Sequence, residues 1–119
     1  MARFSRNRIS LRKSDFKRVF DQNDRSADSL LVILARPNGL TVSRLGLAIA
    51  KTHAPRAVER NRIKRLVRES FMHHQPFDVA IDAVVMNRKG ATLKNNYQLF
   101  SSLTKHWQTI NLKLGRQEK

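Results

Sequence analysis

Apolar and polar positions recur along the chain in two periods, and together they predict helices alternating with strands. A short helix is expected to begin after Ser14, which can cap it, because Phe16, Val19 and Phe20 follow at helical spacing. Residues 21–28 are polar, and they predict a turn region with a short edge strand at its end.

Two strands are expected next. The continuous apolar run 30–35 predicts a strand covered on both faces, and residues 37–39 have turn chemistry. Residues 44–51 predict a second strand, and the two are expected to form an antiparallel pair. Gly46 and the small residues that follow it leave one face of this strand shallow, so that a helix or a nucleic acid backbone can approach closely.

The stretch 55–75 predicts an amphipathic helix with a cationic outer face. Pro55 is tolerated in its first turn, and Pro76 prevents its continuation. Read at the helical period, the inner stripe consists of Ile63, Leu66, Val67, Ser70 and Phe71. The opposite side carries Asn61, Lys64, Arg65 and Arg68, with Arg60 and Arg62 flanking them.

The remainder predicts one strand and one long helix. The strand is expected at 79–86, a basic turn follows at 87–90, and Thr92 can cap the helix. Its apolar stripe, expected to lie in the core, consists of Leu93, Tyr97, Phe100, Leu103, Trp107, Ile110 and Leu114. The order of elements indicates an α+β fold, a small mixed sheet packed with about three helices. General rules make the crossover through the basic helix right-handed if its two strands are parallel neighbours.

Charge narrows the class of partner. The 119 residues suffice for a single domain spanning 1–119, and they include 24 basic and 9 acidic side chains, a net charge of +15. Such an excess favours polyanions as partners. Nucleic acid is favoured over anionic membrane, because the basic helix lacks the broad apolar face of an interfacial anchor.

The chain has no cysteine, no apolar run near the roughly 18 residues of a membrane span, and no signal-like start, so a cytoplasmic location is expected. Residues 1–8 are expected to form a flexible basic arm.

Two features admit both a structural and a functional interpretation. The basic helix could be a solvated surface, but its arginines are poorly compensated, and guanidinium groups suit phosphate contacts and base stacking, which favours RNA binding. Phe16 and Phe20 fit a core position at this spacing, which we favour from the pattern alone, or an open platform on which unpaired bases stack.

The search for catalytic residues yields no convincing constellation. His73 and His74 are adjacent and so point about 100° apart on a helix, and we interpret all four histidines as surface residues near helix ends. Asp78 and Asp82 do not point together in the way that a two-metal carboxylate site requires. No catalytic residue and no metal ligand is therefore expected within the chain.

Two runs of the sequence resemble a known family. Residues 44–51, Arg-Leu-Gly-Leu-Ala-Ile-Ala-Lys, are followed at 57–71 by a helix that contains Arg60-Asn61-Arg62. This combination is similar to the signature of the bacterial ribonuclease P protein subunit, and the similarity extends over nearly the whole chain. Thr52 and His53 depart from it where relatives often carry basic residues, and Asn87 departs where a small residue is common.

The resemblance implies a small basic protein that joins a large catalytic RNA to remove the 5′ leader of precursor tRNA, with hydrolysis carried out by the RNA and Mg²⁺ held mainly by that RNA. It also implies a left-handed crossover, against the general rule. The expected contacts with the catalytic RNA are Lys51, Arg56, Arg60, Asn61, Arg62, Lys64, Arg65 and Arg68. The expected leader-binding cleft contains Arg12, Lys13, Phe16 and Phe20, and Arg88 and Lys89 form a secondary basic pair.

Expected partners are thus the catalytic RNA and precursor tRNA, with no membrane and no small-molecule substrate. Two alternatives remain open at this stage. One is a ribosomal-type RNA-binding protein or RNA chaperone without leader selectivity, and the other is a protein-only nuclease that uses His73, His74 or Asp82.

Overall fold

The structure, a computed structural model, describes residues 10–117, and the arm expected at residues 1–8 lies outside them. In chain order the elements are α2 (Lys13–Asp21), β1 (Asp24–Ala27), β2 (Leu31–Pro37), β3 (Arg44–Ala48), α3 (Ala57–His74), β4 (Ile81–Asn87), the short 3-10 helix η1 (Lys89–Leu93) and α4 (Asn96–Gln117). The α+β class and the order predicted from the sequence are confirmed, including the short edge strand β1. Within residues 10–117, none of the helices combines the length and the hydropathy that a membrane span requires.

The four strands form one mixed sheet in the order β1-β2-β4-β3. β2 pairs antiparallel with both β1 and β4, and β3 pairs parallel with β4. The expected antiparallel pair of β2 and β3 is therefore wrong, because β4 lies between them. β2 and β4 are nearly continuous apolar runs that need cover on both faces, so they take the centre, and the shallow β3 takes the edge.

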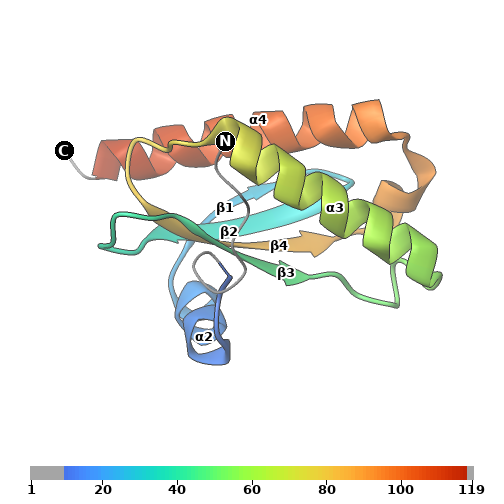
Figure 1. The fold of residues 1–119 in the computed structure, drawn as a ribbon, viewed down its shortest axis with the longest axis horizontal. Coiled ribbons are helices and arrows are strands. Elements are labelled where there is room, and N and C mark those ends of the chain that lie inside the picture. Colours follow the sequence, from blue (N-terminus) through green and yellow to red (C-terminus); the bar gives the residue numbers. More distant parts are fainter. Residues whose placement is uncertain (1–9, 118–119) are drawn as a thin grey trace.

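Helices cover both faces of this sheet (Figure 1). α3 and α4 pack against each other on one face, and α2 lies alone on the other, against β2 and β4. The larger core lies between the sheet and the helix pair, where Phe71 and Trp107 meet edge to face with their ring centroids 5.4 Å apart. A smaller core lies between the sheet and α2, formed by Val19, Val32, Leu34 and Val84.

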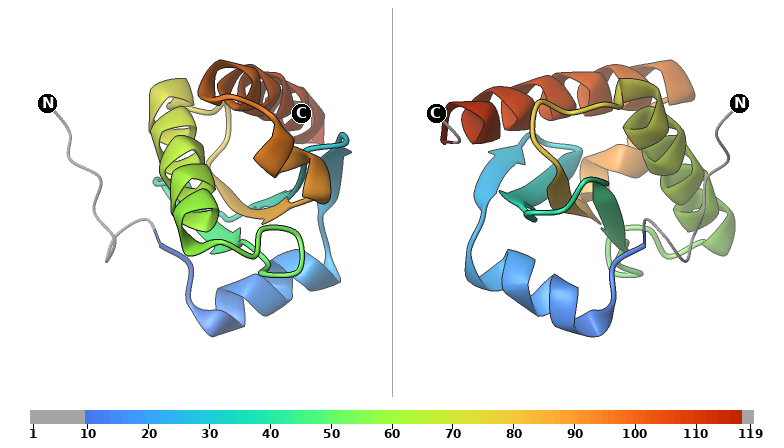
Figure 2. Two further views of the ribbon diagram at one scale, coloured as in Figure 1. Left: turned by 90° about the vertical axis from the view of Figure 1, so that its right-hand side faces the viewer. Right: turned by 60° about the vertical axis from the view of Figure 1, so that its left-hand side comes forward.

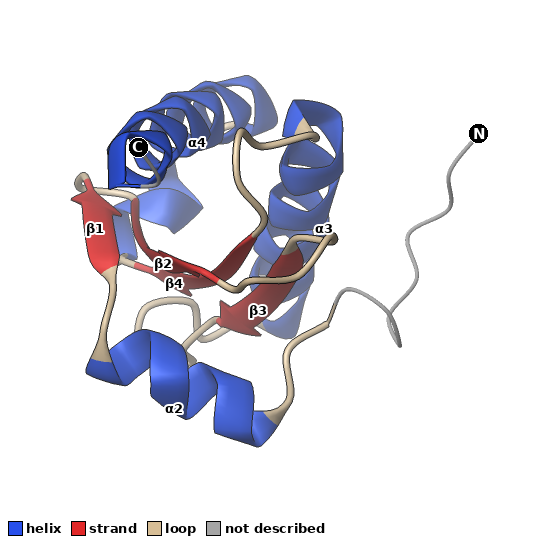
Figure 3. Cartoon of the chain, turned by 90° about the vertical axis from the view of Figure 1, so that its left-hand side faces the viewer, coloured by secondary structure: helices blue, strands red, loops and turns tan. Residues whose placement is uncertain are grey.

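The connection from β3 through α3 to β4 is a left-handed crossover. In Figure 3 the view runs along β3 and β4, which both point away from the viewer, as their arrows in Figure 1 indicate, and α3 lies above the sheet. The chain passes from β3 up through α3 and back to β4 on the left of β3. The handedness expected from general rules is therefore wrong here, and the one implied by the family resemblance is confirmed.

Three helix starts differ from the expected ones. α3 begins at Ala57, so Pro55 precedes the helix and does not lie in its first turn. α2 begins at Lys13, and the backbone N–H of Arg12 donates to Asp15 Oδ2 at 3.0 Å, so Ser14 lies inside the helix and does not cap it. α4 begins at Asn96, and Asn95 and Gln98 exchange hydrogen bonds from backbone N–H to side-chain oxygen, at 3.0 and 2.8 Å.

The later start of α4 changes which residues reach the core. Thr92, the expected cap, instead donates to the carbonyl oxygen of Lys89 within η1. Leu93 and Tyr97, both expected in the apolar stripe, are 83% and 79% exposed, and Leu99 is the first residue of α4 to be buried. The remainder of the expected stripe packs as predicted, with Phe100 partly buried.

Candidate nucleic-acid interface

The rotation of α3 about its own axis is fixed by its buried stripe. All five residues predicted for that stripe are buried. One of them, Ser70, accepts a hydrogen bond from the indole N–H of Trp107 on α4 at 2.9 Å, which ties the two helices together. The opposite, basic face of α3 must therefore point away from the core.

Two arginines of this face are held by the protein itself. Arg60 donates from Nη1 to the carbonyl oxygens of Ala54 and Pro55, at 2.9 and 2.8 Å, and so closes the loop that leads into α3. Arg62 donates to the carbonyl oxygen of Lys94 at 3.1 Å and pairs with Glu59 at 2.9 Å. Both guanidinium groups therefore stabilise the fold through bonds within the protein, whether or not they also contact RNA.

The other predicted contacts are available to a ligand. Arg65 is exposed and lies 3.8 Å from Glu69, and Lys64 and Arg68 make no hydrogen bond or ion pair with the described part of the chain. The remaining predicted contacts, Lys51, Arg56 and Asn61, are exposed. Unpaired cations on one face repel one another, and a bound polyanion removes that cost.

A hollow of about 190 Å³ adjoins this face at the β3 edge of the sheet. Its lining combines Phe16, from the predicted leader cleft, with Arg68, from the predicted RNA-binding set. These two residues lie on helices that cover opposite faces of the sheet, so the hollow joins the two predicted regions. The complete lining is Ser10, Leu11, Phe16, Leu45, Gly46, Leu47 and Arg68.

Phe16 is both a wall of this hollow and part of the smaller core. Its ring lies directly against the backbone of Gly46, where an added Cβ would lie 2.5 Å from Phe16 Cζ. The shallow strand face predicted at Gly46 is thus where α2 approaches the sheet. Phe20 stacks on Phe16 with ring centroids 6.4 Å apart but is 47% exposed, so the core interpretation holds in part for Phe16 and is wrong for Phe20.

A polar cluster joins α2 to the sheet beside the hollow. Arg44 on β3 donates to both oxygens of the buried Asp82, at 2.9 and 2.7 Å, and lies 3.3 Å from Asp15 on α2. The hydrogen bond from the backbone N–H of Arg12 is the largest influence on the pKa of Asp15, which is lowered despite burial, with help from Arg44. Asn38 also donates to Asp82, at 2.9 Å. Asp82 is therefore a structural anchor and is not free to bind a metal ion.

Sequence reasoning missed a second polar cluster under α4. His106, expected at the surface, is buried, and its Nδ1 lies 2.6 Å from Ser26 Oγ and its Nε2 lies 3.1 Å from Asp28 Oδ2. Burial lowers the pKa of His106, against the opposing effect of Asp28. Its place three residues after Leu103 in the apolar stripe is the signal that could have indicated burial.

Asp28 holds this cluster together. Burial alone would raise the pKa of Asp28, but hydrogen bonds from Ser102 and from the N–H groups of Leu31 and Leu30 outweigh it, and the pKa is lowered. Arg88, predicted as a secondary basic contact, donates to the carbonyl oxygen of Asp28 at 2.8 Å, whereas Lys89 is exposed.

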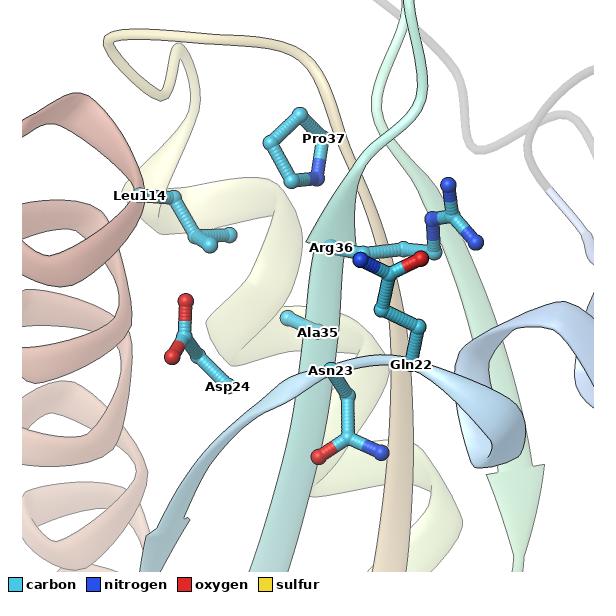
Figure 4. A pocket seen from close by; sticks show the side chains of 7 residues that line it. All are labelled: Gln22, Asn23, Asp24, Ala35, Arg36, Pro37 and Leu114. Atoms are coloured by element: carbon cyan, nitrogen blue, oxygen red, sulfur yellow. The ribbon is translucent and has the colours of Figure 1, made fainter. Parts of the chain in front are cut away.

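Another hollow, of about 150 Å³, lies at the far end of the sheet and contains none of the residues predicted to bind RNA or the leader. Figure 4 shows its lining, Gln22, Asn23, Asp24, Ala35, Arg36, Pro37 and Leu114. The side chains do not converge, because the Arg36 guanidinium extends away from Asp24 and Leu114 and donates to the carbonyl oxygen of Arg18 at 3.4 Å. We assign it no ligand.

Comparison with known proteins decides the family. The family model described as Ribonuclease P matches residues 4–111. The chain belongs to the ribonuclease P protein family. Among curated relatives, the ribonuclease P protein component of Methylococcus capsulatus is 52% identical over 93 residues, which cover 78% of this chain and 73% of that one. The component of Histophilus somni is 45% identical over 105 residues, 88% of each chain.

Solved structures of the family share the fold. The Staphylococcus aureus RNase P protein superposes with a TM-score of 0.77 at 28% identity, covering 84% of this chain and 93% of that one. The Thermotoga maritima RNase P protein gives a TM-score of 0.69 at 26% identity, covering 98% and 97%. The predicted family resemblance is thus confirmed.

Asn87 has a clear structural role. Its side chain accepts a hydrogen bond from the N–H of Ala50 at 2.7 Å and donates to the carbonyl oxygen of Ala50 at 3.2 Å. Asn87 therefore fixes the end of β4 to the segment that leaves β3 toward α3.

Proposed function

We propose that the chain is the protein subunit of ribonuclease P, which binds the catalytic RNA and the 5′ leader of precursor tRNA and so promotes endonucleolytic removal of the leader. The observation that carries this proposal is the hollow shared by Phe16 and Arg68. A single RNA-binding surface can then run from the outer face of α3 around the β3 edge to α2. Such a surface suits a protein that contacts two RNAs at once.

In this proposal the chain binds and positions, and the RNA subunit carries out the hydrolysis with Mg²⁺ that it holds itself. Three acidic side chains of α2, α3 and β4 beside the proposed RNA-binding surface are already paired with arginines. Asp15 and Asp82 are bound to Arg44, and Glu59 is paired with Arg62. We therefore assign no step of the reaction to a metal ion held by these residues.

Binding to the catalytic RNA would depend mainly on phosphate contacts from Lys64, Arg65 and Arg68. Each neutralised phosphate releases counterions, so affinity should fall steeply as salt rises. At α2, the exposed Arg12 and Lys13 could contact leader phosphates while a base stacks on Phe20.

Cleavage of a precursor tRNA at low Mg²⁺ tests the proposal with three mixtures: the protein alone, a bacterial ribonuclease P RNA alone, and both together. We expect cleavage by the pair only. If the protein adds nothing to the RNA, a ribosomal-type RNA-binding protein or RNA chaperone becomes the better account. If the protein cleaves alone, the catalytic role assigned to the RNA is wrong.

A further inference from the structure

Two large apolar side chains are exposed where α4 begins. Leu93 and Tyr97 are the most exposed of the large hydrophobic residues in the described chain. Tyr97 is also the single tyrosine of the sequence. An exposed aromatic ring contributes little to the stability of the fold. Exposed apolar side chains that lie together can instead mark a binding site.

Tyr97 borders an open hollow of about 330 Å³. The hollow lies between the turn that joins β1 to β2 and the outer side of α4, with Lys94 and Lys105 also on its lining. Both lysines are exposed, and neither side chain makes a hydrogen bond or ion pair with any described residue. An aromatic face with two free cations is the combination that binds an unpaired nucleotide.

The acidic group in this lining is already engaged. Asp28 Oδ1 accepts hydrogen bonds from the N–H groups of Leu30 and Leu31, at 2.8 and 2.9 Å, and Oδ2 accepts one from Ser102 at 2.6 Å. Its hydrogen-bonding capacity is thus directed into the protein. The two lysines bring two positive charges to the hollow against the one negative charge of Asp28, whose side chain is 39% exposed.

The hollow is also connected to the basic helix. Arg62 of α3 donates to the carbonyl oxygen of Lys94 at 3.1 Å and to Asn96 Oδ1 at 3.0 Å. Figure 2, left, shows the start of α3, the segment through η1 and the turn between β1 and β2 at one end of the molecule. An RNA that lies on α3 can therefore continue across this end without leaving the protein.

We propose that this end of the molecule is a second contact for the catalytic RNA, in which an unpaired base stacks on Tyr97 and the adjoining phosphates bind Lys94 and Lys105. This inference rests on the proposed function, because it takes the catalytic RNA as the ligand. RNA fits better than an acidic peptide, because a flat exposed ring beside two free lysines matches alternating bases and phosphates. The contact adds an anchoring point separate from the leader-binding cleft.

Chemical modification of Tyr97 tests the contact directly. Nitration of the folded protein by tetranitromethane reports on this single tyrosine, which reacts readily when free because it is exposed. We expect ribonuclease P RNA to protect Tyr97, and mature tRNA at equal nucleotide concentration to protect it far less. An assembled complex in which Tyr97 reacts at the free rate would overturn the proposal.

Substitutions supply the second test, read as affinity for the catalytic RNA. Tyr97→Ala should weaken binding by roughly fivefold or more, as loss of one base–aromatic stack does, and Tyr97→Phe should keep most of it. Leu112→Ala removes another exposed apolar side chain from the same helix and should leave binding unchanged. Equal affinity for Tyr97→Ala and the wild type would contradict stacking.

The lysines are tested by salt dependence. Lys94→Ala with Lys105→Ala should lower the slope of log affinity against log salt by about 1 to 2, whereas Lys113→Ala, farther along α4, should not change it. An unchanged slope in the double variant would contradict phosphate contacts here.

Arg65→Ala separates this inference from the proposed function. If the wild type stimulates the RNA and Arg65→Ala weakens assembly while the Tyr97 and lysine variants behave as wild type, only the second contact is wrong. If the wild type itself fails to stimulate the RNA, the proposed function is wrong.

Discussion

Phe20 is the aromatic residue of α2 that is exposed to solvent, so its substitution tests the proposed leader recognition most directly. Its ring packs only in part, against Phe16, so its removal should cost the fold little. We expect Phe20→Ala to weaken binding of precursor tRNA by roughly fivefold or more in the assembled enzyme, and to leave mature tRNA unaffected. Binding titrations with both tRNAs measure the difference.

The control for Phe20→Ala is Leu40→Ala, which removes an exposed apolar side chain outside the hollow and α2. It should leave both affinities unchanged. Equal losses for the two tRNAs with Phe20→Ala would mean that the ring supports the fold and does not contact the leader.

Gly46 fixes how closely α2 approaches the sheet. A Cβ at this position would lie 2.5 Å from Phe16 Cζ, so Gly46→Ala must displace the ring or the helix. We expect a loss of roughly 1–3 kcal/mol in the free energy of unfolding, as overpacking usually costs, measured by urea denaturation.

Phe16→Ala in the same protein should remove most of that effect, because the two closest atoms both belong to Phe16 and only Leu11 Cδ1, at 3.0 Å, remains. The two substitutions should therefore be strongly non-additive in a double-mutant cycle. Additive losses would show that Gly46 matters for another reason.

For single residues, the sequence predicted where the charged side chains lie but not which of them bond to other parts of the protein. The helical period correctly placed Arg60, Arg62 and Arg65 outside the core. Whether an arginine is free depends on carbonyl oxygens that chain folding brings near, such as Lys94 O beside Arg62, and no local pattern shows these. The surface position predicted for His106 is wrong, because histidine is often exposed, and only its place in the apolar stripe indicates that this one is buried.

Among the elements, α2 is attached to the sheet by its small core and, as the main polar attachment, by Arg44. This guanidinium bonds Asp82 on β4 and approaches Asp15 on α2. Arg44→Met should leave two carboxylates unpaired and lower the free energy of unfolding by roughly 2–3 kcal/mol, below the value for a fully buried pair because its side chain is 19% exposed. Urea denaturation measures the change.

Lys17→Met is the matched comparison for Arg44→Met, because it breaks the exposed pair of Lys17 with Asp21 on the same helix. Its effect should be much smaller, since water screens exposed pairs. If the two variants were equally stable, Arg44 would not be the main polar attachment of α2.

The elements themselves were largely predictable, and their pairing was not. Apolar runs identified β2, β3 and β4, and the helical period identified α3. Which strands become neighbours depends on how many faces each must bury, and this placed β4 between β2 and β3. The start of α4 was set by Asn95 and Gln98, which satisfy each other's backbone N–H groups, a reciprocal arrangement that Thr92 could not provide.

For the whole molecule, two histidines make stability depend on pH. Burial is the main cause that lowers the pKa of both His106 and His74 from the ordinary value of 6.5. Below pH 6.5 the unfolded chain therefore binds more protons than the folded one, and the free energy of unfolding falls as pH falls. We expect a lower urea midpoint at pH 5.5 than at pH 7.5.

Neutral replacements identify the source of this pH dependence. His106→Gln and His74→Gln should each reduce the difference between the two midpoints, and the double variant should reduce it most. A double variant with the wild-type difference would place the titrating groups elsewhere.

The unequal cores on the two faces of the sheet have a consequence for motion. The α2 side is closed by a small core and by the cluster around Arg44, whereas α3 and α4 share a much larger one. Opening of α2 should therefore require less free energy than global unfolding, and its amide hydrogens should exchange faster than those of β4. Under the proposed function, one wall of the leader-binding cleft would then move while the basic face of α3 stays rigid, which would let leaders of different sequence bind without weakening the contact with the catalytic RNA.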